Sequence, residues 1–200
     1  MSEIKFSSRI LKRFAETIAL ELGADQFNGM LTMANLPVEW KNPDVYQAMD
    51  PGDAAHVYAA LQTAMRTYFG RGARGVLLRV GQRLWHQLLD DAALGIKAQA
   101  AVVKRLPLAS RRKPTLELLA KFIGAQAGDI TVHTLDLDLL LVDQASPAAH
   151  DQKEAGPICF VTQGLIRESL FWATGKSYDV EEIHCQALGE HTCEFKVTGG

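Results

Sequence analysis

The stretch YDVEEIHCQALGEHTCEFKV, residues 178–197, decides how the C-terminal part of the chain folds. Residues 178–185 and 192–197 alternate apolar and polar side chains, a period of two that is typical of β-strands. Gly189 lies in the short segment between them, where a chain reversal favours glycine. The pattern therefore predicts an antiparallel pair of strands, with Cys185 at the end of the first and Cys193 near the start of the second.

The chain has 3 cysteines, and all of them lie in its last quarter. A helix is predicted over residues 158–174, with Pro157 in its first turn and Gly175 at its end. Cys159 opens this helix, where the helix dipole favours the thiolate. Three thiolates from a helix start and two adjacent strands suit a four-ligand zinc site. Buried free cysteines, or a Cys185–Cys193 disulfide across the hairpin, are the alternatives.

The pattern of residues leaves the fourth ligand open. Candidate carboxylates and imidazoles crowd the same segment: Asp179, Glu181, Glu182, His184 and His191. Residues three apart on a regular strand face opposite sides, so Glu182 and Cys185 reach one ion only if a β-bulge separates them. Strand parity alone makes Glu181 or the loop histidine His191 equally good ligands.

The rest of the chain predicts helices and a further strand region. Apolar residues recur every three to four positions in a helix from Ser7 or Ser8 to residue 22, and helices are also predicted at 27–34, 51–68, 76–89, 92–106 and 115–126. Residues 130–142 alternate and predict one or two strands. Runs of helices with a separate antiparallel sheet indicate an α+β fold. Residues 1–50 are predicted to form an N-terminal helical segment, and residues 51–200 the main domain.

An apolar stripe marks the first helix. It consists of Ile10, Leu11, Phe14, Ile18 and Leu22. This is more than a short segment is expected to bury locally, and symmetric pairing with a second copy is the commonest solution. The stripe therefore predicts a homodimer formed through the segment 1–50.

Composition is that of an ordinary globular protein, with 48% apolar and 22% charged residues. No apolar run is long enough to span a membrane, and the N-terminus lacks the pattern of a signal peptide. An odd cysteine count without a secretion signal predicts a reducing, cytoplasmic location. Residues 54–116 carry eleven basic and two acidic side chains, a net +9, against −11 for the rest. Solvated helix faces explain this asymmetry, and a basic rim for an anionic ligand or an acidic partner is the functional alternative. No nucleic-acid-reading motif is present.

Residues 157–197 resemble the vinyl-4-reductase domain. That domain is also the effector-sensing part of phenol-responsive bacterial activators and is related to Golgi transport-complex subunits. The resemblance is carried by Cys159, Gly164, Gly175, the run 180–185, Gly189 and the run 193–197, with Gly164 and Gly175 in register as helix-end glycines. In the sensors, the equivalents of Cys159, Glu182, Cys185 and Cys193 bind one structural zinc.

The resemblance implies a two-layer α+β domain in which a small antiparallel sheet and its helices enclose a pocket for small hydrophobic ligands. It also implies dimers paired by N-terminal helices. Residues 139–142 are aliphatic where the phenol sensors place a tryptophan, so a bulkier or more aliphatic ligand is expected. The family name suggests a vinyl reductase, or an accessory factor in bacteriochlorophyll synthesis, as one alternative. The transport subunits suggest a protein-interaction adaptor as another.

Five residues on the predicted helices are candidates for lining the ligand pocket: Trp85, His86, Phe122, Phe160 and Trp172. Ordinary core packing is the alternative for each of them. No nucleophile–base pair or phosphate loop is apparent, and three thiolates with one carboxylate leave zinc no open position for water. The sequence thus predicts a non-catalytic protein that binds a small hydrophobic ligand, and the basic segment would suit an anionic group on that ligand.

Overall fold

The computed structural model describes residues 4–199. Its α-helices are α1 (Ser8–Leu22), α2 (Ala24–Met33), α3 (Pro51–Phe69), α4 (Ala73–Asp90), α5 (Leu94–Arg105), α6 (Arg112–Ile123) and α7 (Phe160–Thr174). Its strands are β1 (Ile130–Leu135), β2 (Asp138–Asp143), β3 (Asp179–His184) and β4 (Cys193–Thr198). The predicted α+β class is confirmed.

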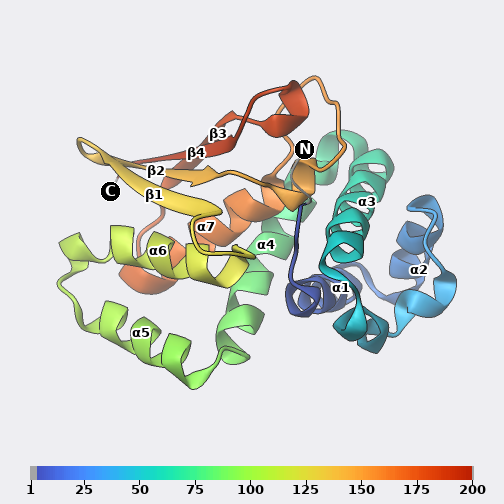
Figure 1. The fold of residues 1–200 in the computed structure, drawn as a ribbon, viewed down its shortest axis with the longest axis horizontal. Coiled ribbons are helices and arrows are strands. Elements are labelled where there is room, and N and C mark those ends of the chain that lie inside the picture. The colour runs from blue at the N-terminus through green and yellow to red at the C-terminus, as the bar shows by residue number, and fades with distance from the viewer. Residues whose placement is uncertain (1–3, 200) are drawn as a thin grey trace.

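The four strands form one antiparallel sheet in the order β1-β2-β4-β3. β1 and β2 form a hairpin, and β4 inserts between β2 and β3. Figure 1 shows the sheet lying over α7, with α4 and α6 beneath and α1, α2 and α3 to one side. The inner face of the sheet supplies Leu139, Leu141, Phe195 and Val197 to the core, all buried. The sheet thereby packs on helices, as expected for two layers.

α7 is the central helix, and it crosses α4 at a pair of glycines. A β-carbon added to Gly81 would lie 2.2 Å from the carbonyl oxygen of Val161 and 3.0 Å from Cα of Gly164. One added to Gly164 would lie 2.2 Å from the carbonyl oxygen of Leu78. The backbones of the two helices are therefore in direct contact, which only glycine permits at both positions. Gly164 lies inside α7 rather than at a helix end, so that part of the prediction is wrong.

The apolar stripe of α1 is buried within the same chain. Ile10, Leu11, Phe14 and Ile18 are each at most 2% exposed. Helix α1 packs on α4, α3 and the 3-10 helix at Pro43–Ala48. The premise that this stripe needs a second copy is therefore wrong, because longer-range packing supplies the cover that local sequence could not reveal. The boundary at residue 50 stays a prediction.

Helix bounds differ from the predictions by a few residues. α2 begins at Ala24 because Gly23, with φ of 88°, separates it from α1. α6 begins at Arg112 and ends before Gly124, so Pro114 stands at its third position and Gly128 lies beyond it. α7 begins at Phe160, which leaves Cys159 as the residue before the helix and Pro157 outside it.

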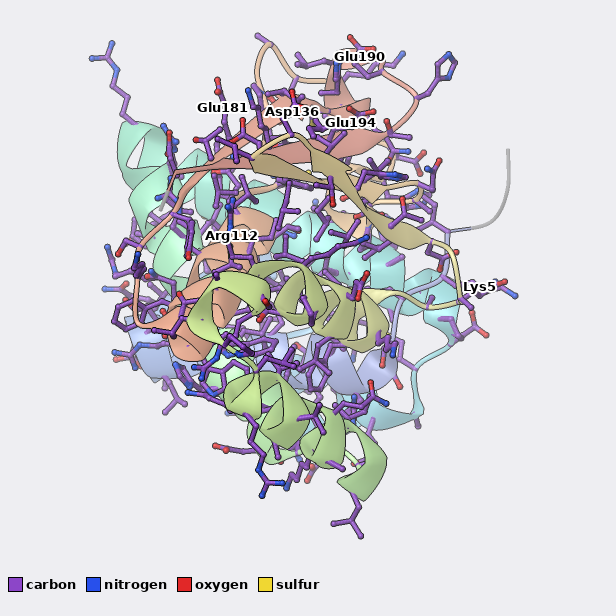
Figure 2. The ribbon with its side chains drawn as sticks, turned by 90° about the vertical axis from the view of Figure 1, so that its left-hand side faces the viewer. Lys5, Arg112, Asp136, Glu181, Glu190 and Glu194 are labelled. Atoms are coloured by element: carbon purple, nitrogen blue, oxygen red, sulfur yellow. The ribbon has the colours of Figure 1, made fainter. Side chains whose placement is uncertain are left out.

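Acidic side chains lie along the sheet, and many of the basic side chains on the helices have partners within the chain. Figure 2 shows acidic Asp136, Glu181, Glu190 and Glu194 along the sheet. Many cations of the basic segment 54–116 have partners within the chain: Arg66 pairs with Glu154, Arg79 and Arg83 with Glu21, and Arg111 and Arg112 donate to backbone carbonyls. Because these cations are already paired, the structure favours solvated helix faces over a basic rim reserved for a ligand.

Within residues 4–199 no helix has the length and apolarity needed to cross a bilayer.

Candidate metal centre

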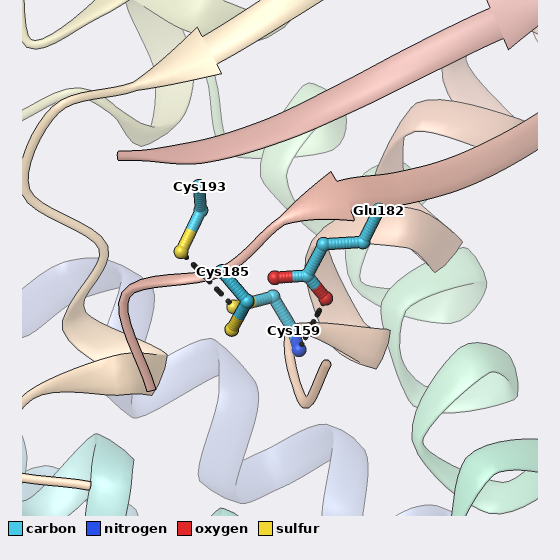
Figure 3. A group of neighbouring side chains, drawn as sticks. All are labelled: Cys159, Glu182, Cys185 and Cys193. Carbon is cyan, nitrogen blue, oxygen red and sulfur yellow. Dashed lines mark hydrogen bonds between the residues drawn. The ribbon is translucent and has the colours of Figure 1, made fainter. Parts of the chain in front are cut away.

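Three elements bring a cysteine each to one buried point. Cys159 stands immediately before α7, Cys185 follows β3, and Cys193 begins β4. Glu182 on β3 joins them, as Figure 3 shows. The ligand atoms of these four side chains all lie within 4.8 Å of one another, and all four residues are buried. The structure thus brings together the four residues that the resemblance implied, and all three thiols are free, so the disulfide alternative is wrong.

A β-bulge resolves the problem of strand parity. Glu182 pairs with Phe195 and His184 with Glu194, so Ile183 is an extra residue on β3. Ile183 and His184 are both exposed, which returns Cys185 to the same side as Glu182. A bulge inserts one residue and re-aims the side chains that follow it. The alternative ligands Glu181 and His191 are exposed and do not belong to the buried cluster.

Polar contacts hold the four side chains in place. The backbone N–H of Cys159 donates to Oε2 of Glu182 over 2.9 Å, and the backbone N–H of Gln186 donates to Sγ of Cys193 over 3.3 Å. Sγ of Cys159 lies 3.6 Å from Sγ of Cys193. Two sulfurs bound tetrahedrally at about 2.3 Å from zinc lie about 3.8 Å apart. Oε1 of Glu182 is buried and has no hydrogen-bond partner among the described residues. The spacing and this unpaired oxygen both fit a metal ion.

The electrostatics of the cluster point the same way. Hydrogen bonds from the Cys159 and Cys193 thiols lower the pKa of Cys185 well below its ordinary value. The hydrogen bond to Cys185 and burial raise the pKa of Cys159, and burial raises the pKa of Glu182 to about 8. Four acids in one buried space cannot all ionise without a countercharge. A divalent cation would supply that charge, and its binding would release the protons.

Gln186 supports the site, although the sequence analysis did not single it out. Its Nε2 donates to the carbonyl oxygens of Gln144, over 3.0 Å, and His191, over 2.9 Å. Its Oε1 accepts from the backbone N–H of Ser146 over 3.0 Å. Gln186 thereby ties the segment after β2 to the β3–β4 connection. The only hint in the sequence was that Gln186 directly follows Cys185. Its partners Gln144 and Ser146 are about forty residues away, so the sequence alone does not reveal its role.

Three of the predicted ligand-binding residues, Trp85, Phe122 and Trp172, lie together in the core, and the other two, His86 and Phe160, do not join them. Trp85 is fully buried, and its ring meets Phe122 and Trp172 with centroids 5.6 and 5.5 Å away. Nε1 of Trp85 has no hydrogen-bond partner among residues 4–199. His86 follows Trp85 on α4 and therefore lies on a different face of the helix, where it is exposed to solvent. Its Nε2 lies 2.8 Å from Oε1 of Glu168. Phe160 is half-buried at the start of α7, next to Cys159.

Asp143, at the end of β2, is a further buried acid that the sequence analysis missed. It is 4% exposed, and its Oδ1 accepts from the backbone N–H of Ala145 over 3.1 Å. Its Cα pairs with that of Cys193 in the sheet register. Burial raises the pKa of Asp143 to about 7. An aspartate at the end of an apolar strand is normally expected in an exposed turn, so only the folded structure reveals that Asp143 is buried.

Asp143→Asn is expected to change how stability depends on pH. Because the folded-state pKa is raised above the unfolded value of about 3.9, ionisation favours unfolding as the pH rises from about 4 to about 7. Asparagine removes that loss, so the unfolding free energy of the variant minus that of the wild type should rise by roughly 2–3 kcal/mol between pH 5 and pH 8. Urea unfolding at the two pH values measures it. Asp179→Asn, at an exposed position, controls for loss of a charge, and an equal change in both variants would contradict the prediction.

The fold and the site define a helical α+β domain with a buried site of three thiols and one carboxylate. Residues 142–198 match the family model of the vinyl-4-reductase domain, and this segment contains all four cluster residues. The match confirms the predicted resemblance over the C-terminal part of the chain. Among curated proteins, no sequence match was found.

Solved structures align with this fold over most of the chain. An H-NOX protein from S. oneidensis in the Fe(II)NO state aligns with TM-score 0.59 and 14% identity, over 96% of this chain and 98% of that one. An H-NOX protein from K. algicida gives TM-score 0.59 and 14% identity, over 96% and 95%. The phenol-responsive sensory domain of the transcription activator PoxR, with phenol, gives TM-score 0.50 and 15% identity, over 70% and 73%. At these identities the likeness shows the fold alone.

Haem, which descriptions of the H-NOX structures name, does not fit this chain through histidine ligation. The histidines are His56, His86, His133, His150, His184 and His191. His150 is partly exposed and the other five are exposed. A haem iron held by a proximal histidine needs that imidazole inside the pocket. The donor set that is buried here consists of thiols and one carboxylate, which suits zinc instead.

Proposed function

We propose that this chain is a non-catalytic, small-molecule-binding sensor domain whose C-terminal part is held together by one structural zinc ion. The observation that carries the proposal is that the vinyl-4-reductase match at residues 142–198 includes all four members of the buried cluster. A site with three thiolates and one carboxylate is closed to water, as structural zinc sites are. The zinc would therefore fix the start of α7 to the ends of β3 and β4, and would not act on a substrate.

The ligand is proposed to bind against the aromatic cluster of Trp85, Phe122 and Trp172. Phe160, at the start of α7, and His86, which faces solvent, are not part of this cluster. The buried and unpartnered Nε1 of Trp85 is a donor in need of an acceptor. Nζ of Lys104 lies 4.5 Å from the centre of the Trp172 ring, so a cation stands beside the cluster. An apolar molecule with an anionic group, such as a fatty acid or a porphyrin-like compound, matches this combination.

Fatty acids or porphyrin-like compounds are expected to quench tryptophan fluorescence and to raise the melting temperature. At a ligand concentration of 100 times Kd the gain is about 2.7 kcal/mol, or roughly 5–10 °C for a chain of this size. Trp85→Phe should remove most of the quenching and weaken binding about tenfold, because it removes the buried donor. The matched control is Trp40→Phe, since Trp40 packs on Tyr46 away from the cluster. A panel that changes neither signal would count against a ligand at this cluster.

An adaptor role is the second candidate, because α5 and the segment after it expose large apolar side chains. Leu94 is 86%, Val102 57% and Leu108 56% exposed. Such residues suit contact with another protein.

The homodimer also stays a proposal. Because the apolar stripe of α1 is buried, a dimer would need another apolar surface, such as that of α5. Sedimentation of the protein at high micromolar concentration tests the dimer directly.

A further inference from the structure

Strand β1 forms one edge of the four-stranded sheet. Among residues 4–199 it packs mainly on β2 and on α6, which lies beneath it (Figure 1). Residues 136–137 form a two-residue turn, so Leu135 and Asp138 are the hydrogen-bonded pair that closes the hairpin. Bonded and non-bonded pairs alternate from there along β1, and every second residue directs its backbone N–H and C=O groups to the open edge. These residues are Ile130, Val132 and Thr134.

The sequence of β1 lacks the features that protect edge strands. Residues 130–135 read ITVHTL, without a charged residue or a proline, and their pairing with β2 is continuous. Edge strands usually carry charges, prolines or bulges that prevent pairing with another chain. The opposite edge follows this rule, because β3 exposes Asp179 and Glu181 and has the bulge at Ile183. The contrast indicates that β1, and not β3, is available to a further strand.

An open groove of about 500 Å³ lies between β1 and α6. Because β2 covers the other side of β1, this groove opens at the edge of the sheet. Ile130 and Val132 line it from the strand, and both are half-buried. The segment 124–128 also lines it and consists mostly of glycine and alanine. Glu117 and Lys121 on α6 have opposite charges, so the groove suits uncharged side chains.

A second copy of β1 matches this edge in its backbone and in its side chains. Val132 stands opposite Leu141, which is buried beneath the sheet. Alternate residues share a face, so Ile130, Val132 and Thr134 form the inner row of β1. In an antiparallel pair of two copies centred on Val132, this residue meets its own copy, and Ile130 meets Thr134. No charge then stands opposite a like charge, and the inner row of each copy meets the groove of the other.

We propose that the β1 strands of two copies pair antiparallel around a two-fold axis at Val132 and join the two sheets into one. The inner side chains of each strand enter the groove between β1 and α6 of the other copy. The proposal rests on the homodimer proposed above and assigns to it the edge of β1 in place of the surface of α5. A six-residue strand and its groove bury less than a standard interface of about 1,600 Å², so the dimer should form at micromolar concentrations.

Sedimentation of the zinc-loaded full chain across the micromolar range tests the surface. Thr134→Lys, at an exposed position of β1, should weaken dimerisation at least about tenfold, because pairing would bury the added charge in the groove. Val102→Lys adds the same charge to α5 and should leave dimerisation unchanged. A dimer that is lost in Val102→Lys and kept in Thr134→Lys would overturn this surface but not the homodimer. A wild type that stays monomeric would overturn both and would leave the edge of β1 to a strand of another protein.

Cross-linking and hydrogen exchange test the strand pairing itself. With oxidised glutathione, Val132→Cys should form a disulfide-linked dimer, because the Cα atoms of a hydrogen-bonded pair lie about 5.5 Å apart. Thr134→Cys should not, because the pairing separates the two copies of residue 134 by about 13 Å along the strand. Equal cross-linking of the two variants would overturn the pairing. In the wild type, which needs no substitution, exchange of the Val132 and Thr134 amides should slow as the protein concentration rises, and unchanged exchange would also overturn the proposal.

Discussion

Cys185→Ser is expected to release the metal and to destabilise the domain more than any other single substitution at the site. Cys185 is the member of the cluster whose pKa is lowered, because the thiols of Cys159 and Cys193 donate hydrogen bonds to it. Structural zinc contributes its binding free energy directly to folding, so a loss of about 5 kcal/mol or more is expected. Native mass spectrometry should show one zinc per chain in the wild type and none in the variant, and urea unfolding should show the loss of stability.

The neighbouring glutamates provide a matched control for the fourth ligand. Glu182→Gln should weaken zinc binding about 10–100-fold, because the amide is a poorer ligand and carries no charge. Glu181→Gln changes the same group one residue earlier, on the exposed face of β3, and should retain the metal fully. Equal metal content in both variants would remove Glu182 from the ligand set, and zinc retained in Cys185→Ser would contradict the site as a whole.

Local patterns were sufficient to predict most of the secondary structure. The alternation of residues 178–185 and the glycine at 189 led directly to β3, β4 and their connection, since period and turn chemistry are local properties. The stripe on α1 was identified correctly, but its partner was not. Phe14 packs on Tyr58 of α3, more than forty residues away, and no local pattern reveals which distant surface will cover an apolar face.

The candidate metal centre was predictable in composition but not in geometry. The spacing of the cysteines indicated three ligands, and the resemblance, not the spacing, selected Glu182. The bulge at Ile183 that makes this choice possible depends on how β3 pairs with β4, which the sequence of β3 alone does not specify. Gln186 and Asp143 were missed for a related reason, because their partners and their burial come from segments that meet only in the folded chain.

The close contact of Gly81 and Gly164 at the crossing of α4 and α7 could not be predicted from the sequence, because the two helices meet only in the folded chain. Gly81 stands in the middle of a helix, where glycine normally weakens the structure by about 1 kcal/mol relative to alanine. Propensity alone therefore predicts that alanine at residue 81 is stabilising. The contact of Gly81 with the backbone of Val161 predicts the opposite sign.

Gly81→Ala is expected to lower the unfolding free energy by about 3 kcal/mol or more, at the upper end of what overpacking does. The new methyl group would lie 2.2 Å from the carbonyl oxygen of Val161. That atom is backbone, so relief requires α7 to move away from α4. α7 begins directly after Cys159, and its displacement would also disturb the cluster. Urea unfolding of the zinc-loaded variant measures the loss, and its metal content shows whether the cluster follows.

Gly75→Ala is the matched control, because Gly75 lies on the same helix but away from the crossing. A β-carbon there would meet only Nη1 of Arg79, at 3.8 Å. Gly75→Ala should therefore leave stability unchanged or raise it by up to about 1 kcal/mol through helix propensity. Opposite signs for the two substitutions would show that contact between the helices outweighs propensity at residue 81. If Gly81→Ala were as stable as Gly75→Ala, the close crossing of α4 and α7 would be wrong, and with it the rigid frame that holds Trp85 on α4 against Trp172 on α7.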